Sequence, residues 1–295
     1  MPTYCKRAMK FILNWLNDEN LQHLSAAESN RITQKLIYGI GAILIGVLLV
    51  ATAWFTYTHY FTKKKHRVIR EFGIALPLQY KIHGIDVSKH QGEIDWKLVK
   101  TMRAKGVRLQ FVFAKATEGA TLTDRRFAEN WSALKQQRLA RGAYHFFRPS
   151  ENAHLQAANF IKTVPMQVGD LPPVLDVEVR GIVSKKKFEE RVTVWLADIE
   201  KFYGIEPIVY SNKDFYLKHL QTVCKNKPVW IAHYYEEDLS LSRNWLFWQH
   251  SDRGTVNGVD ERVDFNVFSG DSAAFANILY CKKNLLRKAP RKSIK

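Results

Sequence analysis

Residues 170–181, DLPPVLDVEVRG, carry two acids inside an otherwise apolar run. The run follows Pro-Pro and ends at a glycine, which predicts a short buried strand. Side chains two positions apart on a strand point to the same face, so Asp176 and Glu178 face one way and Val177 and Val179 the other. Two like charges this close in apolar surroundings are costly, and they raise the pKa of at least one carboxyl group. The stretch therefore indicates an acid pair with a function.

Seven further strand-like runs surround this one, and helical patterns fill the first gaps between them. Such alternation predicts parallel strands joined by crossover helices. Eight strands favour an α/β fold closed into a barrel, whose last three strands are too closely spaced to carry full helices. The expected helices lie around residues 95–105, 124–139, 152–163, 185–203 and 213–220. The expected strands are KIHGIDV (81–87), LQFVFAKA (109–116), RGAYHFF (141–147), PPVLDVEV (172–179), EPIVYS (206–211), KPVWIA (227–232), LFWQH (246–250) and RVDFNVF (262–268).

Polar residues mark the carboxyl ends of these strands, where chemistry gathers in barrels of parallel strands. Asp86 ends the first strand, and Asp264 lies on the eighth. Together with Asp176 and Glu178 they would bring four acids to one mouth. Carboxylates can supply acid catalysis, while flat rings and amides can hold sugar rings, so the pattern predicts a glycan site. The candidate substrate-binding residues are Tyr144, Tyr210, Trp230, Tyr234 and Gln249, and barrel packing is the competing interpretation for the aromatic ones.

The net charge of +17 does not indicate a nucleic-acid partner, because the excess lies outside the predicted barrel. Residues 82–281 hold 27 of the 45 Lys+Arg and 24 of the 28 Asp+Glu, which leaves that block at +3. The basic runs in the flanks are of a kind that more often meets anionic lipid or solvent than bases. The sequence has no G-x-G-x-x-G motif and no P-loop, so we expect no nucleotide either.

Metal ligands and a disulfide framework are not evident. The histidines show no zinc-type spacing with a third ligand in register, so we expect neither a metal nor a cofactor. The cysteines are Cys5, Cys224 and Cys281. Cys224 and Cys281 could pair in an oxidising compartment, and unpaired thiols are the alternative.

A membrane span is predicted ahead of the barrel. No charged residue lies between Lys35 and Lys63, and the gap contains LIYGIGAILIGVLLVATAWFTY, which is long enough to cross a bilayer. We expect a single-pass anchor over residues 37–61, with an aromatic belt at its far end. A buried core helix and a signal peptide cleaved near residues 51–53 are the alternatives; the long segment ahead of the run favours an uncleaved anchor.

The rest of the chain divides around this span. Residues 1–36 form a tail that fits either an amphipathic helix on the membrane or a marginal helix without a role. We expect a basic linker at 62–81, the barrel at 82–270 and a basic tail at 271–295. More Lys and Arg follow the span than precede it, which would put the barrel in the cytoplasm. The predicted function needs it outside the cytoplasm, and we expect that orientation.

Several motifs resemble, in order and spacing, those of the glycoside hydrolase family 25 lysozymes. The resemblance runs from about His83 to Phe268 and implies a TIM-like (β/α)5β3 barrel. It also implies cleavage of the β-1,4 bond between N-acetylmuramic acid and N-acetylglucosamine in the glycan strands of peptidoglycan. The family's four acidic positions are occupied by Asp86, Asp176, Glu178 and Asp264. The motifs are HGIDVSKHQGEIDW (83–96), FVFAKATEGATLTD (111–124), RGAYHFFRP (141–149), LPPVLDVE (171–178), PVWIAHY (228–234) and VDFNVF (263–268).

We hypothesise that Glu178 is the general acid, with its pKa raised by Asp176 and by apolar surroundings. Asp176 would stay ionised and stabilise positive charge at the sugar. The resemblance suggests that the substrate's own N-acetyl group attacks to give an oxazolinium intermediate, with Asp176 orienting it. Asp86 and Asp264 would support the pair or contact the sugar, and turn or cap roles are their alternative.

Other interpretations remain open at this point. The acid pair could be neutralised by Arg180 or a barrel lysine. The domain could be a non-catalytic peptidoglycan-binding envelope tether, a hydrolase of another N-acetylated glycan such as chitin, or a phage-derived lysin. Lys115 and Glu118 are expected to form a structural pair, and residues 184–192 a helix start with a solvated face.

Overall fold

The computed structural model describes residues 26–61 and 66–281. Most of the predicted N-terminal tail, part of the linker and most of the basic C-terminal tail lie outside the described residues, as does Cys5. The chain divides into two compact units, residues 1–64 and 65–295. Each unit is therefore described by itself.

The first unit contains one long helix, α2 (Ala26–Phe61). Its segment Asn30–Thr58 contains an 18-residue window with a mean hydropathy of 2.4, and none of that window is buried in protein. The hydroxyl groups of Thr52 and Thr56 donate to backbone carbonyls of the preceding helical turn, which satisfies these polar groups without water. The helix is long and apolar enough to cross a bilayer, and its length and position fit both a membrane anchor and a signal sequence.

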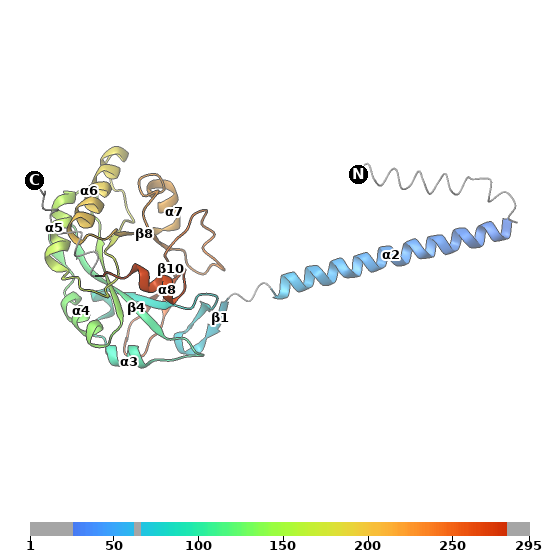
Figure 1. The fold of residues 1–295 in the computed structure, drawn as a ribbon, viewed down its shortest axis with the longest axis horizontal. Helices are drawn as coiled ribbons and strands as arrows, with labels where there is room; N and C mark the ends of the chain where they lie inside the picture. Colours follow the sequence, from blue (N-terminus) through green and yellow to red (C-terminus); the bar gives the residue numbers. More distant parts are fainter. Residues whose placement is uncertain (1–25, 62–65, 282–295) are drawn as a thin grey trace, which may run out of the picture. The chain divides into compact units, whose positions relative to one another are not determined.

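The second unit is an eight-stranded α/β barrel, as the sequence predicts (Figure 1). The sheet runs in the order β3-β11-β10-β9-β8-β7-β6-β4, and pairing of β3 with β4 closes it. Every pairing is parallel except those of β11, which runs antiparallel to both of its neighbours. The barrel strands are β3 (His83–Val87), β4 (Leu109–Glu118), β6 (Ala140–Phe146), β7 (Val174–Asp176), β8 (Ile208–Asn212), β9 (Val229–Ala232), β10 (Phe247–Gly254) and β11 (Val263–Phe268).

Helical segments follow the first five of these strands, and loops join the last three. Short elements that the sequence analysis did not predict are the hairpin β1 (His66–Ile69) and β2 (Ile74–Pro77) with the turn η2 (Arg70–Phe72), the turn η3 (Lys89–Gln91), the strand β5 (Leu122–Thr123), and the helix α8 (Ser272–Ile278), which lies in the predicted basic tail. The other helical segments are α3 (Trp96–Thr101), α4 (Phe127–Gln136), α5 (Ala153–Thr163), α6 (Lys185–Tyr203), and α7 (Lys213–Phe215) with the π-helical turn η4 (Tyr216–Leu220).

Helix α6 illustrates how local sequence sets these elements. It begins after Ser184, whose hydroxyl accepts from the backbone N–H of Lys187, and it ends at Gly204, which has a left-handed φ of 69°. Loss of such a cap costs about 1 kcal/mol. Trp195 and other apolar residues at helical spacing are buried against the barrel, while the lysines of its first turn are exposed. The predicted helix start with a solvated face is confirmed.

Aromatic side chains fill the barrel interior below its mouth. Phe113 stacks on Trp230 with ring centroids 4.5 Å apart, and Phe247 packs edge-on against Phe113. Room for these rings comes from glycines on neighbouring strands. A Cβ at Gly84 or Gly142 would lie 2.5 Å or less from a phenylalanine ring atom. The interior of the barrel is thus filled with packed aromatic side chains.

Candidate active site

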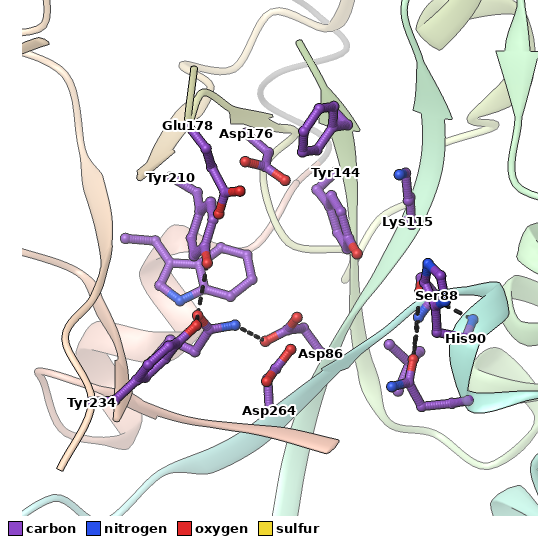
Figure 2. A pocket seen from close by; sticks show the side chains of 15 residues that line it. Asp86, Ser88, His90, Lys115, Tyr144, Asp176, Glu178, Tyr210, Tyr234 and Asp264 are labelled. Atoms are coloured by element: carbon purple, nitrogen blue, oxygen red, sulfur yellow. Dashed lines mark hydrogen bonds between the residues drawn. The ribbon is translucent and has the colours of Figure 1, made fainter. Parts of the chain in front are cut away.

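A pocket of about 300 Å³ opens at the carboxyl ends of the strands (Figure 2). Side chains from all eight barrel strands and from the segment after β3 converge on it. All nine residues that the sequence singled out line this pocket. They are Asp86, Tyr144, Asp176, Glu178, Tyr210, Trp230, Tyr234, Gln249 and Asp264.

The first acid pair, Asp176 and Glu178, lies at the end of β7, on the same side of the chain (Figure 2). Strand pairing ends at Asp176, three residues earlier than expected, because the chain then turns outward as a loop. Val177 keeps the backbone extended for one more residue, since its N–H donates to the carbonyl of Tyr210 at 2.9 Å. Val177 is buried in the core as expected, whereas Val179 is 43% exposed.

Burial raises the pKa of both carboxyl groups, and the rise is larger for Asp176. The pKa of Asp176 lies well above its ordinary value because of burial, with the charge of Glu178 adding to the effect. Burial also raises the pKa of Glu178, against a hydrogen bond from Tyr210 and the charge of Lys115. The expected division, with an ionised Asp176 and a protonated Glu178, is therefore not what burial alone produces. The pair retains a proton at higher pH than two solvated carboxyl groups would.

Asp176 Oδ1 is buried and has no hydrogen-bond partner. Buried carboxylate oxygens are normally paired, so an unpaired one at a pocket wall is suited to accept a hydrogen bond from a ligand. The neutralising partner considered above is not found. Arg180 donates to the backbone carbonyl of Val183, and no ion pair joins a described Lys or Arg to either acid. Lys115 instead pairs with Glu118 at 2.7 Å, which confirms the predicted structural pair.

The second acid pair, Asp86 and Asp264, comes from neighbouring antiparallel strands. These two residues are direct partners in the register of β3 with β11. Burial raises the pKa of Asp86 well above its ordinary value, and the nearby Asp264 raises it further. The pKa of Asp264 is raised to about 6, mainly by burial, while a hydrogen bond with Asp86 opposes the shift. A proton shared between the two carboxyl groups relieves their repulsion.

A hydrogen-bond network connects the second pair to the aromatic residues. Asp86 Oδ2 accepts from the Gln249 and Asn266 side-chain amides, each at 2.7 Å. Gln249 Oε1 accepts from the hydroxyl groups of Tyr210 at 2.7 Å and Tyr234 at 2.8 Å. These contacts fix the amide orientation of Gln249 and aim both tyrosines at the pocket. The predicted aromatic and amide residues are therefore polar members of the pocket wall as well as packing residues.

The sequence analysis missed Asn266, which is fully buried and accepts from Trp230 Nε1 at 2.7 Å. Strand alternation could have identified Asn266, because it lies two positions after Asp264 and hence on the same strand face. It also missed six residues that line the pocket beside the acids: Val87, Ser88, His90, Gln91, Lys115 and Phe146. Ser88, His90 and Gln91 belong to the capped turn that follows β3, where no strand periodicity marks them.

The described part of the chain contains no cluster of metal-binding side chains. Within residues 26–61 and 66–281, no group of three or more His, Cys, Asp or Glu side chains is arranged to hold a metal ion. Cys224 is a buried free thiol whose pKa burial raises to about 12, and Cys281 is exposed.

A closed α/β barrel with two acid pairs at its mouth defines a glycoside hydrolase. Residues 85–259 match the family model described as "Glycosyl hydrolases family 25", and the chain belongs to this family. The expected family membership is thereby confirmed.

Relatives with known names and structures agree with this assignment. The Escherichia coli K12 protein "Uncharacterized protein YegX" is 47% identical over 215 residues, covering 72% of this chain and 78% of the relative. The "Autolytic lysozyme" of Clostridium acetobutylicum is 32% identical, covering 63% and 55% of the two chains. A family 25 glycosyl hydrolase from Bacillus anthracis has a similar structure, with a TM-score of 0.62, 33% identity, and coverage of 68% of this chain and 94% of the other.

Proposed function

We propose that the barrel is a lysozyme-type N-acetylmuramidase that hydrolyses the β-1,4 bond between N-acetylmuramic acid and N-acetylglucosamine in peptidoglycan. The observation that carries this proposal is the acid pair Asp176 and Glu178 at the pocket wall, with which no Lys or Arg of residues 26–61 and 66–281 forms an ion pair. Relatives named lysozyme, among them "Lysozyme M1" of Streptomyces globisporus, support the substrate class. In this proposal the barrel is the (β/α)5β3 variant of the TIM-like fold.

The first step requires a proton on the glycosidic oxygen as the bond breaks. Glu178 is the less buried member of the pair, and its raised pKa lets it keep a proton to higher pH than a solvated glutamate would. It therefore serves as the general acid. After the leaving sugar departs, the same carboxylate can take a proton from water.

Asp176 stabilises the positive charge that develops at the sugar. Its pKa is high in the pocket as described, but a cation beside it lowers the pKa and favours the ionised form. Its unpaired Oδ1 can accept the N–H of the substrate's acetamido group, which orients that group for attack to give an oxazolinium intermediate. Asp86 and Asp264 support the site through the network that holds Tyr210, Tyr234 and Gln249.

We also propose that residues 37–61 anchor the chain in a membrane as a single span, with the barrel outside the cytoplasm, where peptidoglycan lies. The length and apolar composition of α2 support a span, and the substrate supports the orientation. A reporter enzyme fused to the C-terminus, active only outside the cytoplasm, tests the orientation directly.

The activity is tested with Glu178→Gln on purified peptidoglycan in a zymogram. We expect the wild-type chain to clear the substrate and the variant to lose at least about 100-fold in rate, because general acid catalysis contributes about 10²–10⁴-fold. Glutamine has nearly the same shape, so folding and glycan binding should persist. A variant as active as wild type would refute the role of Glu178.

Assays on the same substrates distinguish the muramidase from two alternative functions. A wild-type chain that binds peptidoglycan without lysis would favour the non-catalytic tether. Mass spectrometry of products from defined peptidoglycan and chitin oligomers distinguishes a muramidase from a hydrolase of another N-acetylated glycan.

A further inference from the structure

Tyr235 is an exposed aromatic residue at the barrel mouth whose backbone is strained. It follows the pocket residue Tyr234 and lies three residues after the end of β9. Its side chain is 59% exposed, and its φ is 61°. This left-handed conformation is rare for bulky side chains, whereas glycine or asparagine adopts it readily. Strain of this kind persists only where the surroundings hold it, and it concentrates at functional sites.

Contacts with β10 hold Tyr235 in this conformation. The last residue pair of β10 with β9 is Gln249 with Ala232, and β10 then continues past the barrel mouth to Gly254. The backbone N–H of Tyr235 donates to the carbonyl of His250 at 3.2 Å. Its hydroxyl group donates to the carboxylate of Asp252. The Arg253 guanidinium lies over the Tyr235 ring, 4.8 Å from its centroid.

The Tyr235 ring continues an aromatic surface that begins inside the pocket. Its centroid is 6.0 Å from that of Tyr234, whose hydroxyl group belongs to the Gln249 network. A pocket of about 300 Å³ is at the small end of ligand sites, so a polymeric glycan has to continue past the rim. Tyr235 lies where that continuation would pass on the β9 and β10 side.

We propose that Tyr235, supported by Asp252 and Arg253, is an outer subsite that binds a further sugar unit of the glycan strand. The inference rests on the proposed function and adds a determinant of chain-length preference to it. The ring offers a flat apolar surface to the C–H face of a sugar. Asp252 and Arg253, whose side chains are 41% and 70% exposed, offer hydrogen-bonding groups to the sugar's polar substituents. The backbone conformation alone would favour glycine at this position. The presence of a tyrosine therefore indicates that its ring has a role.

The experiment measures binding without cleavage, using the full-length chain in detergent with the Glu178→Gln substitution. Affinity is measured for long glycan strands and for a tetrasaccharide of the same repeat. We expect Tyr235→Gly to reduce the preference for long strands about tenfold, the size of effect expected for loss of one aromatic contact. Tyr235→Phe, which keeps the ring, should retain the preference within about twofold.

Stability and a matched control separate a binding role from a structural one. Tyr235→Gly should stay folded and melt close to the parent, because relief of the backbone strain offsets the lost contacts with Asp252 and Arg253. Phe202→Ala removes another exposed ring, on α6, and should leave the length preference unchanged. An unchanged preference in Tyr235→Gly would overturn the subsite, and so would an equal loss of affinity for long strands and for the tetrasaccharide, which is what a disturbed pocket would produce. Failure of the wild-type chain to cleave peptidoglycan would count against the muramidase instead, since the subsite is judged from binding alone.

Discussion

Replacing Gln249 with leucine is the most direct test of the network that holds the pocket together. Gln249 is 2% exposed, accepts from the hydroxyl groups of Tyr210 and Tyr234, and donates to Asp86. Leucine is similar in size, so Gln249→Leu removes three hydrogen bonds and opens little cavity. The effect should therefore report on the polar contacts themselves.

The magnitude follows from those three bonds. Each hydrogen bond contributes about 1 kcal/mol net, and a buried polar group left unpaired costs about 1–3 kcal/mol. Asp86 keeps its bond from Asn266, half-buried Tyr234 can turn to solvent, and Tyr210 can turn to Glu178, so no buried polar group is left without a partner. We expect the free energy of unfolding to fall by about 3 kcal/mol, the net value of the three lost bonds. The pKa of Asp86 should rise further, since the bond from Gln249 stabilises its ionised form.

The assay is urea unfolding of the full chain in detergent, followed by tryptophan fluorescence. Gln249→Glu is the matched control, because it keeps an acceptor for both tyrosines but puts a carboxyl group against Asp86. Its destabilisation should be larger at pH 8 than at pH 5, where a protonated carboxyl can still donate. A double-mutant cycle with Asp86→Ala should give a coupling energy of at least about 1 kcal/mol. A loss below about 1 kcal/mol in Gln249→Leu would refute the network as a source of stability.

Two further predictions concern buried charges. The free energy of unfolding should fall as pH rises from about 4 to 6 and beyond. Asp264 has a pKa of about 6 in the folded chain against an ordinary 3.8, so in this range the folded state keeps a proton that the unfolded state releases. Asp264→Asn should reduce that fall by up to about 3 kcal/mol, and urea midpoints at pH 4, 6 and 8 check this; an unaltered slope would contradict it. Arg141→Met should cost about 3–5 kcal/mol of unfolding free energy, since it leaves Asp170, 2.8 Å from Arg141 Nε, buried without its cation. Arg126→Met, which breaks an exposed pair, should cost far less than Arg141→Met in the same urea titration, and equal losses in the two variants would argue against a special role for burial.

Local patterns in the sequence were sufficient for much of the barrel. Apolar runs, glycines and prolines set where each strand begins and ends to within a few residues, because they act on the backbone nearby. The strand of Asp176 is the clearest exception. Its apolar pattern continues to Val179, but strand pairing stops at Asp176, where the chain turns outward as a loop although the neighbouring strand β8 continues to Asn212. The point at which a strand leaves the sheet is a property of the assembled barrel.

The pocket network illustrates a second limit. Asp86 and Gln249 are 163 residues apart in sequence, and Asp86 and Asn266 are 180 apart. Their hydrogen bonds exist only because β11 inserts antiparallel between β3 and β10 and so closes the barrel. Asp264 and Asn266 share a strand face by simple alternation, yet nothing local reveals which residue each will meet.

The sequence by itself determined the strand order along the chain, the apolar helix ahead of the barrel, and the acids and rings that end each strand, because these depend on short-range periodicity and residue chemistry. Barrel closure alone decided that Asp86 faces Asp264, that Gln249 joins two tyrosines to Asp86, and that Asp176 is the most strongly desolvated acid of its pair. Those outcomes depend on distant segments displacing water from one another, and desolvation is a property of the packed molecule.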